Sequence, residues 1–279
     1  MREERLSPIT RAFSGVGLWA WLFVAIFPFL WMILISFRKP VDAFSTPPKL
    51  IAPFTLENFR YIWIEDGFWL YALNTTIVTA LTMAVSLTIG CLAAYALSRY
   101  RGSVGFWLLI AALIFRAMPH VVLLTAYRPA FFELGIWSRY ETLIIVLVAI
   151  NQPFTIWMLR AFFMSIPTEL DEAAMVDGCT RFGAFRRVII PVMWPGIVTA
   201  GLFSFLLAYN DFLISSQLMN GDMSTMTAAL ANYMGQNQSV ARLMHGIAGA
   251  VSITIPIIIL VYAFQKQIVA GMTAGAVKG

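Results

Sequence analysis

The sequence predicts an all-α integral membrane protein with six transmembrane helices, and three observations support this fold class. The chain has 279 residues, of which 60% are hydrophobic and only 12% are charged. Soluble domains carry about 25% charged residues, so this composition is typical of a chain that lies mostly in lipid. The mean hydropathy is +0.79. In addition, apolar runs of about 20 residues, the length at which a helix crosses a bilayer, recur along the sequence.

Six apolar segments meet this length requirement and define a transmembrane domain, residues 16–264. In chain order they are Val16–Phe37, Leu73–Leu97, Phe106–Tyr127, Thr142–Met164, Val188–Ser215 and Gly246–Phe264. Prolines fall inside these segments, where membrane helices accommodate them as kinks; among them are Pro28, Pro119, Pro153 and Pro256. The remaining residues are predicted to form an N-terminal segment, residues 1–15, and a C-terminal tail, residues 265–279.

The distribution of Lys and Arg predicts the orientation in the membrane. Most of these residues fall on one side when the N-terminus is placed in the cytoplasm, so both termini and the loop 165–191 are expected to be cytoplasmic. The basic residues are dispersed along membrane flanks, and the formal net charge of +5 therefore does not indicate nucleic-acid binding. The charged start, Met1–Arg5, is unlike a cleaved signal peptide, and we expect the first apolar segment to be retained.

The loop 165–191 is a polar stretch within this apolar chain, and its first half has the features of a short amphipathic helix. Pro167 suits a first helical turn, and Gly178 is placed to end the helix in a left-handed conformation. Carboxylates gather near the N-terminus, where the helix dipole favours negative charge: Glu169, Asp171 and Glu172. Small or apolar residues share one face and would let another backbone approach: Leu170, Ala173 and Ala174.

Residues 172–191 resemble the EAA loop of the membrane subunits of bacterial ABC importers. In that family the loop forms a coupling helix that docks in a cleft of the ATPase subunit. Val188 and Ile190 stand where isoleucine and leucine are usual. Without the full spacing of the motif, an ordinary amphipathic loop helix would be the alternative. The resemblance implies the type I permease fold of ABC importers, and it assigns ATPase coupling to Glu172, Ala173, Ala174, Asp177, Gly178 and Pro191.

Two distant segments resemble the carbohydrate permeases of this family, the maltose-transporter G-type permeases. The tail Gly271–Gly279 reads G-M-T-A-G-A-V-K-G, which is nearly identical to the end of such permeases. Tyr209-Asn210-Asp211-Phe212 is similar to the W-N-E-F of their fifth helix, with Tyr for Trp and Asp for Glu. The resemblance therefore implies an ATP-driven, binding-protein-dependent importer of a sugar, oligosaccharide or polyol, possibly acidic.

The same resemblance implies the partners and the location of the chain. We expect as partners a second homologous permease subunit, two ATPase subunits, an extracytoplasmic solute-binding protein and a sugar substrate. The chain itself is expected to lie in the lipid of the bacterial inner membrane. No catalytic residue and no metal site are predicted, because the sequence has no nucleophile–base or metal-ligand cluster. The sequence lacks the P-loop pattern G-x-x-x-x-G-K-[ST], so ATP and Mg²⁺ are expected on the partner ATPases, and no cofactor on this chain.

Polar residues at membrane depth are the candidates for the substrate pathway, because they are costly in lipid and usually face a cavity or a partner. They are Arg116, His120, Asn151, Gln152, Ser204, Asn210 and Asp211. Arg116 and His120 are four residues apart, which places them on one face of a continuous third helix. Alternative roles stay open: structure or gating for Arg116, packing for His120, and helix capping at the outer interface for Asn210 and Asp211.

Two other classes of function remain to be compared with the importer. An ion-coupled secondary carrier would need paired intramembrane carboxylates and an internal repeat, and Asp211 alone does not meet this requirement. A membrane enzyme would need a catalytic constellation that the sequence does not contain. Copurification of an ATPase would distinguish the importer from both.

Overall fold

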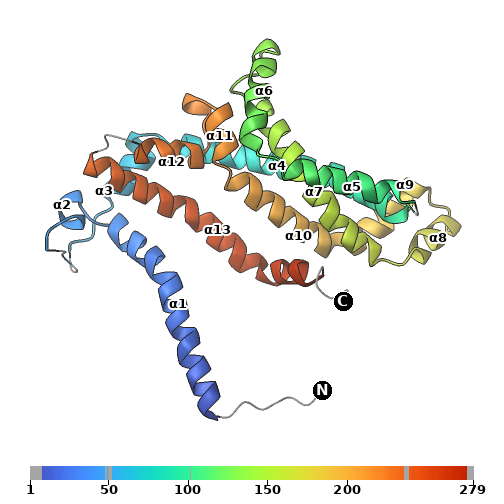
Figure 1. The fold of residues 1–279 in the computed structure, drawn as a ribbon, viewed down its shortest axis with the longest axis horizontal. Helices are drawn as coiled ribbons and strands as arrows, with labels where there is room; N and C mark the ends of the chain where they lie inside the picture. The colour runs from blue at the N-terminus through green and yellow to red at the C-terminus, as the bar shows by residue number, and fades with distance from the viewer. Residues whose placement is uncertain (1–7, 48, 50–51, 101, 236–238, 275–279) are drawn as a thin grey trace. The chain divides into compact units, whose positions relative to one another are not determined.

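The structure, a computed structural model, describes residues 8–47, 49, 52–100, 102–235 and 239–274 (Figure 1). These residues form helices joined by turns and loops, with no strand among them, which confirms the all-α fold class. The α-helices are α1 (Pro8–Ser36), α2 (Pro40–Ala43), α3 (Glu57–Arg60), α4 (Phe68–Arg99), α5 (Val104–Arg116), α6 (His120–Glu133), α7 (Tyr140–Met164), α8 (Glu169–Val176), α9 (Arg181–Ala184), α10 (Ile190–Tyr209), α11 (Leu213–Leu218), α12 (Met226–Met234) and α13 (Val240–Ala274). Three short helices of other types complete the order: the π-helices η1 (Tyr61–Glu65) and η2 (Phe185–Ile189) and the 3-10 helix η3 (Gly221–Met223).

Five of the described helices are long and apolar enough to cross a membrane. They are Gly15–Ser36, Phe68–Arg99, Tyr140–Met164, Arg181–Tyr209 and Val240–Val269. The third predicted segment corresponds to a shorter apolar helix, Val104–Arg116. The six predicted segments are helical over most of their length, but two of them are interrupted. The third is interrupted at residues 117–119, and the fifth, predicted to run to Ser215, is interrupted at residues 210–212, between α10 and α11.

The prediction of one continuous helix over 106–127 is wrong. Helix α5 ends at Arg116 and α6 begins at His120, and Figure 1 shows the two helices running in different directions. Pro119 lies between them, exposed. Proline has no N–H to continue the helix, and it disfavours the helical conformation of the residue before it. Pro153 and Pro256, by contrast, lie inside continuous helices, as predicted.

The helix α13 continues ten residues past the predicted end of the last span, to Ala274. Its backbone departs from helical geometry at Phe264, where φ is −115° and ψ is 15°. This kink coincides with the boundary that hydropathy predicts at residue 264. Residues 265–274 of the predicted tail are thus helical, and residues 275–279 lie outside the described part of the chain.

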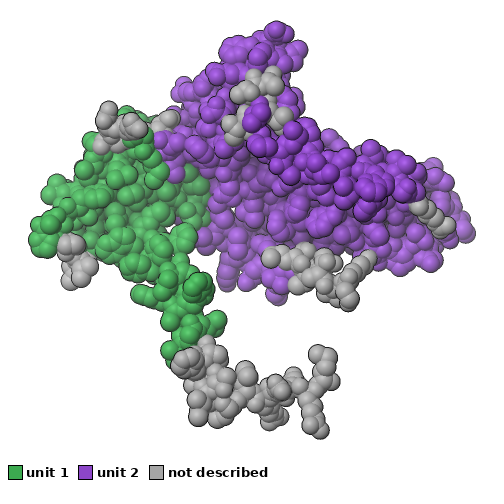
Figure 2. All heavy atoms as spheres, in the orientation of Figure 1, with its two compact units in different colours: residues 1–67, 233–254 green, residues 68–232, 255–279 purple. Residues whose placement is uncertain are grey.

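The chain divides into two compact units, which Figure 2 shows in different colours. Unit 1 consists of residues 1–67 and 233–254, and unit 2 of residues 68–232 and 255–279. In unit 1, buried Asn58 donates hydrogen bonds of 2.8 Å to the carbonyl oxygens of Ser36 and Arg38. Asn58 thereby satisfies carbonyl groups that the end of α1 leaves without an intrahelical partner.

In unit 2, α4 packs along α7 and α10. Small residues permit this close approach. A Cβ atom at Gly90 would lie only 2.8 Å from Cγ2 of Thr155, so glycine is needed where α4 meets α7. The buried apolar cluster around this contact includes Cys91, Ala94, Met158, Leu159, Phe163, Ile166, Phe185, Ile189, Met193 and Ala200.

Candidate functional site

The helix α8 forms within the predicted coupling loop and has the predicted charge pattern. It begins at Glu169, so Pro167 lies before the helix and not in its first turn. Glu169, Asp171 and Glu172 occupy the first turn, where the unpaired N–H groups attract negative charge. Local sequence therefore determines where this helix starts.

The predicted left-handed cap at the end of α8 is confirmed. Gly178 has φ of +88°. The N–H group of Gly178 donates to the carbonyl of Met175 at 3.1 Å, and that of Cys179 donates to the carbonyl of Ala174 at 3.0 Å. These two bonds form a Schellman motif. No heavy atom lies within 4 Å of a Cβ built at Gly178, so backbone conformation alone favours glycine there.

The predicted apolar face of α8 is divided between its two sides. Ala174 is buried, whereas Leu170 and Ala173 are exposed. The side chain that lies beside Ala174 on the buried side is a carboxylate, Asp171, with 9% of its surface exposed. Ion pairing accounts for this orientation, because buried Asp171 faces Arg99 of α4, whereas Leu170 and Ala173 are exposed.

Asp171 has two partners on α4. Its Oδ2 atom lies 2.8 Å from Nη2 of Arg99, and its Oδ1 atom accepts a hydrogen bond of 2.6 Å from the hydroxyl of Tyr95. A groove of about 530 Å³ lies between α8 and the end of α4, lined in part by these three residues. The motif assigned no role to Asp171. The sequence signal that could have identified its partner was Arg99, which follows the second apolar segment.

The residues assigned to coupling are mostly accessible. Glu172, Ala173, Asp177 and Gly178 are exposed on or just after α8, whereas Ala174 faces the bundle. Pro191 is also exposed and lies in the first turn of α10, where the missing N–H is no loss. The exposed side of α8 also carries Val176, with 87% of its surface accessible.

Three of the candidate pathway residues meet where α4, α7 and α10 pack. Asn151 and Ser204 are buried, and both contact Thr155: its hydroxyl donates to the carbonyl of Asn151 at 3.3 Å and lies 3.2 Å from the hydroxyl of Ser204. The amide of Gln152 donates to the carbonyl of Ser86 at 3.4 Å. These residues form a polar layer between tightly packed helices in this conformation.

Arg116 and His120 do not share a helix face, because the helix is interrupted at Pro119 and they lie on α5 and α6. Nη1 of Arg116 donates to the carbonyl of Ile150 at 3.3 Å, and Cζ of Arg116 lies 5.0 Å from the ring centre of Phe154. Arg116 is therefore held against α7 by its own contacts.

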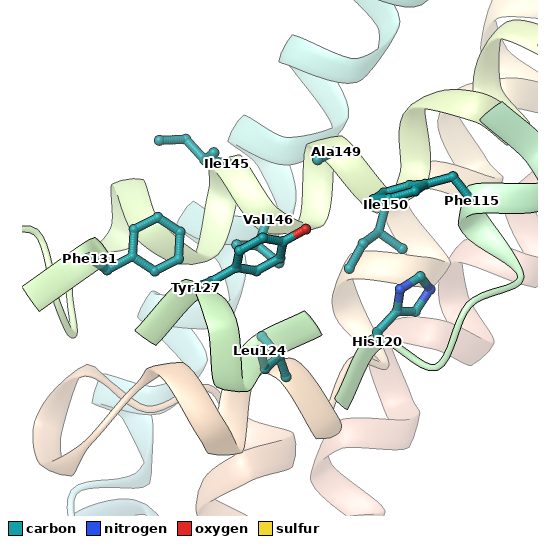
Figure 3. Close-up of a pocket in the computed structure, with 9 residues that line it drawn as sticks. All are labelled: Phe115, His120, Leu124, Tyr127, Phe131, Ile145, Val146, Ala149 and Ile150. Atoms are coloured by element: carbon teal, nitrogen blue, oxygen red, sulfur yellow. The ribbon is translucent and has the colours of Figure 1, made fainter. Parts of the chain in front are cut away.

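His120 lines a small cavity of about 140 Å³ between α5, α6 and α7. Figure 3 shows its ring beside Phe115 and Ile150, with Tyr127 across the cavity. The other lining residues are aliphatic or aromatic: Leu124, Phe131, Ile145, Val146 and Ala149. Such a surface suits apolar or aromatic contact, and His120 and the hydroxyl of Tyr127 are its polar groups.

Asn210 and Asp211 have the capping roles that were left open as an alternative. Asn210 ends α10, and its amide donates to the carbonyl of Leu206 at 2.9 Å. Asp211 precedes α11 and accepts hydrogen bonds of 2.8 Å from both the backbone N–H and the hydroxyl of Ser215. Both side chains thus satisfy helix ends at the junction of α10 and α11.

Comparison with known families assigns the chain to a family of transport proteins. The family described as binding-protein-dependent transport system inner membrane component matches residues 86–274, which include α8, its cap and most of unit 2. The chain belongs to this family. It is a multi-pass permease subunit of the inner membrane, and α8 lies within the matched residues.

Full-length relatives support the assignment of this permease. It is 35% identical to the trehalose transport system permease protein SugB of Mycobacterium tuberculosis, over 91% of the chain and 93% of that protein. It is 31% identical to the sulfoquinovosyl glycerol transport system permease protein SmoH of Agrobacterium fabrum, over 91% of the chain and 89% of that protein.

The fold of the permease is also found among solved structures. A chain of a bacterial ABC transporter involved in the import of the acidic polysaccharide alginate superposes with a TM-score of 0.77 at 21% sequence identity. The match covers 95% of this permease and 99% of that chain. The predicted type I permease fold is therefore confirmed.

Proposed function

We propose that this permease forms half of the translocation pathway of an ATP-driven importer for a neutral or mildly acidic sugar. A second, homologous permease would complete the pathway, two ATPase subunits would supply the energy, and an extracytoplasmic binding protein would deliver the solute. Membership of a binding-protein-dependent family supports this proposal over an ion-coupled carrier. In this proposal the chain catalyses no reaction, and ATP with Mg²⁺ binds to the ATPase subunits.

The observation that carries the proposal is the exposed side of α8. Its apolar residues Leu170, Ala173 and Val176 recur at three-residue spacing, and Glu172 adds a charge at the edge. A short helix that projects such a surface from a membrane bundle is suited to insertion into a groove of a soluble partner. We assign the ATPase subunit as that partner, which requires α8 and both chain termini to be cytoplasmic.

The sugar class is proposed from the relatives and from the polar residues at membrane depth. SugB is named for trehalose, a neutral sugar, and SmoH for a sulfonated one. The polar layer of Asn151, Gln152 and Ser204 offers amide and hydroxyl groups that can hydrogen-bond sugar hydroxyls if the helices separate during alternating access. Arg116 would favour an anionic group on the sugar.

Purification and uptake test the proposal directly. The tagged permease should copurify with an ATPase that mass spectrometry identifies, and vesicles containing the complex and its binding protein should take up a labelled sugar only with ATP. The panel would contain trehalose, maltose and sulfoquinovosyl glycerol, with methionine as the negative control. Uptake that follows a proton or sodium gradient without ATP would contradict the proposal.

A further inference from the structure

Arg99, the last residue of α4, contacts three helices at one end of unit 2. Its Nη2 atom lies 2.8 Å from Oδ2 of Asp171 in α8. Its Nη1 atom donates hydrogen bonds to the carbonyls of Phe163 at 3.3 Å and Ile166 at 3.1 Å, where α7 ends. One guanidinium therefore joins the ends of α4 and α7 to the first turn of α8.

The end of α7 returns a contact to α4. Nε of Arg160 donates to the carbonyl of Leu97 at 3.4 Å. Cationic side chains near helix C-termini are favourable because the last carbonyls have no intrahelical partner and carry partial negative charge. Each of the two helices thus supplies an arginine to the end of the other, and Arg99 extends this connection to α8.

Tyr95, one turn before Arg99 on α4, holds the second oxygen of the Asp171 carboxylate through its hydroxyl. Its ring packs 4.8 Å from that of Phe185 and 5.7 Å from that of Phe163, measured between ring centres. The carboxylate of Asp171 thus has a partner at each oxygen, an ion pair with Arg99 at Oδ2 and a hydrogen bond from Tyr95 at Oδ1, and aromatic packing holds the ring of Tyr95.

The Arg99–Asp171 pair is well shielded from solvent. Its side chains are 18% and 12% exposed, whereas those of the Lys39–Glu57 pair are 61% and 69% exposed. Salt and water weaken exposed pairs strongly and buried pairs much less. Removal of one partner would leave the other charge unpaired in a desolvated place, which is strongly unfavourable. Each residue of the pair therefore depends on the other for the balance of its charge.

We propose that Arg99 and Asp171 are positioning residues that hold α8 against the ends of α4 and α7, so that the three helices move as one body. This inference rests on the proposed coupling of α8 to an ATPase. The helix α8 has eight residues, and Ala174 is its one buried apolar residue. Apolar contact on that face is therefore small, and the ion pair, together with the hydrogen bond from Tyr95, supplies the attachment through which a displacement of α8 would move α4.

The attachment can be measured without ATPase subunits. A nitroxide label at Val176→Cys, in a Cys179→Ser background, reports the mobility of α8 in the permease purified in lipid nanodiscs with its partner permease. We expect Arg99→Gln and Asp171→Asn each to increase the mobile spectral fraction at least twofold. Arg99→Lys keeps the charge but not the planar group and should give an intermediate value. Arg186→Gln, at an exposed arginine of η2, is the matched control and should not change the spectrum.

The consequence for coupling is measured on the unlabelled complete complex. Arg99→Gln should still copurify with the ATPase, because the exposed side of α8 is unchanged, but uptake per ATP hydrolysed should fall at least tenfold. The probe is labelled trehalose, or the panel sugar that the unmodified complex imports. Unchanged mobility together with unchanged uptake per ATP in Arg99→Gln would overturn the inference.

Two further comparisons separate failure of this inference from failure of the proposed function. If Arg99→Gln does not accumulate in the membrane, Asp171→Asn decides the question, because asparagine still accepts the hydrogen bond from Tyr95 and loses only the charge. If the unmodified permease copurifies with no ATPase, the proposed coupling function fails, while the nitroxide spectra still decide whether the pair positions α8.

Discussion

At the residue scale, Gly178 shows how a single backbone conformation supports a functional surface. Its φ of +88° is costly for any residue with a Cβ atom, and asparagine tolerates it better than valine. The bonds that it permits end α8 directly after Val176, so that Asp177 and Gly178 lie at the edge of the exposed side. The position of the helix end depends on this residue.

Gly178→Val should lower the stability of the α8 cap by about 1–2 kcal/mol, because a β-branched residue is strained in the left-handed region. We expect weaker copurification of the ATPase, or ATP hydrolysis that no longer drives uptake. Gly178→Asn is the matched control and should retain most coupling, since asparagine also occurs at this cap position. Normal assembly and uptake in Gly178→Val would contradict this role of the cap.

A substitution at Arg116 tests whether the native substrate is neutral or acidic. Its guanidinium lies over Phe154 and bonds a carbonyl of α7, so glutamine there removes charge at a defined place. If the native sugar is anionic, Arg116→Gln should reduce its uptake at least a hundredfold, while the complex still assembles, because charge-assisted bonds are the strong ones. Arg128→Gln, which removes an exposed arginine of α6, is the control. Unchanged uptake in Arg116→Gln would remove Arg116 from the pathway and leave the neutral sugar.

At the element scale, the first turns of α4 organise the opposite end of unit 2. Buried Asn74 donates to the carbonyls of Asp222 at 2.7 Å and Ser224 at 2.9 Å, and it accepts from the hydroxyl of Tyr140 at 2.6 Å. The next residue, Thr75, accepts from the N–H of Met226 at 2.8 Å. The start of α7 and the segment around η3 are therefore both attached to α4.

Asn74→Ala should destabilise this end by several kcal/mol, since each buried polar group left without a partner costs about 1–3 kcal/mol. We expect a lower midpoint of thermal unfolding in detergent and faster proteolysis within residues 219–226. Asn220→Ala, at an exposed position of the same segment, should change neither measurement. Equal behaviour of the two variants would show that the hydrogen bonds of Asn74 do not hold the segment.

At the scale of the whole molecule, the proposed orientation follows from the charges at the membrane flanks. Single cysteines at Ser239 and Ser7, in a background that lacks Cys91 and Cys179, test it in intact cells. An impermeant thiol reagent should label Ser239→Cys and not Ser7→Cys, because the segment 220–240 is proposed to be outside and the N-terminus inside. Labelling only at position 7 would reverse the topology, and α8 could then not meet a cytoplasmic ATPase.

Properties that depend on neighbouring residues in the chain could be predicted from the sequence alone. Hydropathy summed over about 20 residues located the apolar spans, because the cost of placing a helix in lipid is a sum over its own side chains. The acidic first turn of α8 and its glycine cap were also predictable, since both act on backbone groups one turn away. The kink at Phe264 fell where the hydropathy of the last segment ended.

Contacts between distant residues were decided by the tertiary structure. Pro119 and Pro153 looked alike in the sequence, yet α7, which packs against α4 and α10, is continuous through buried Pro153, whereas the helix is interrupted at exposed Pro119. Likewise, Asp171 stands next to the recognised motif, but its pairing with Arg99 depends on how α4 and α7 bring their ends together. A local pattern states which groups need partners, and only packing determines where the partners are.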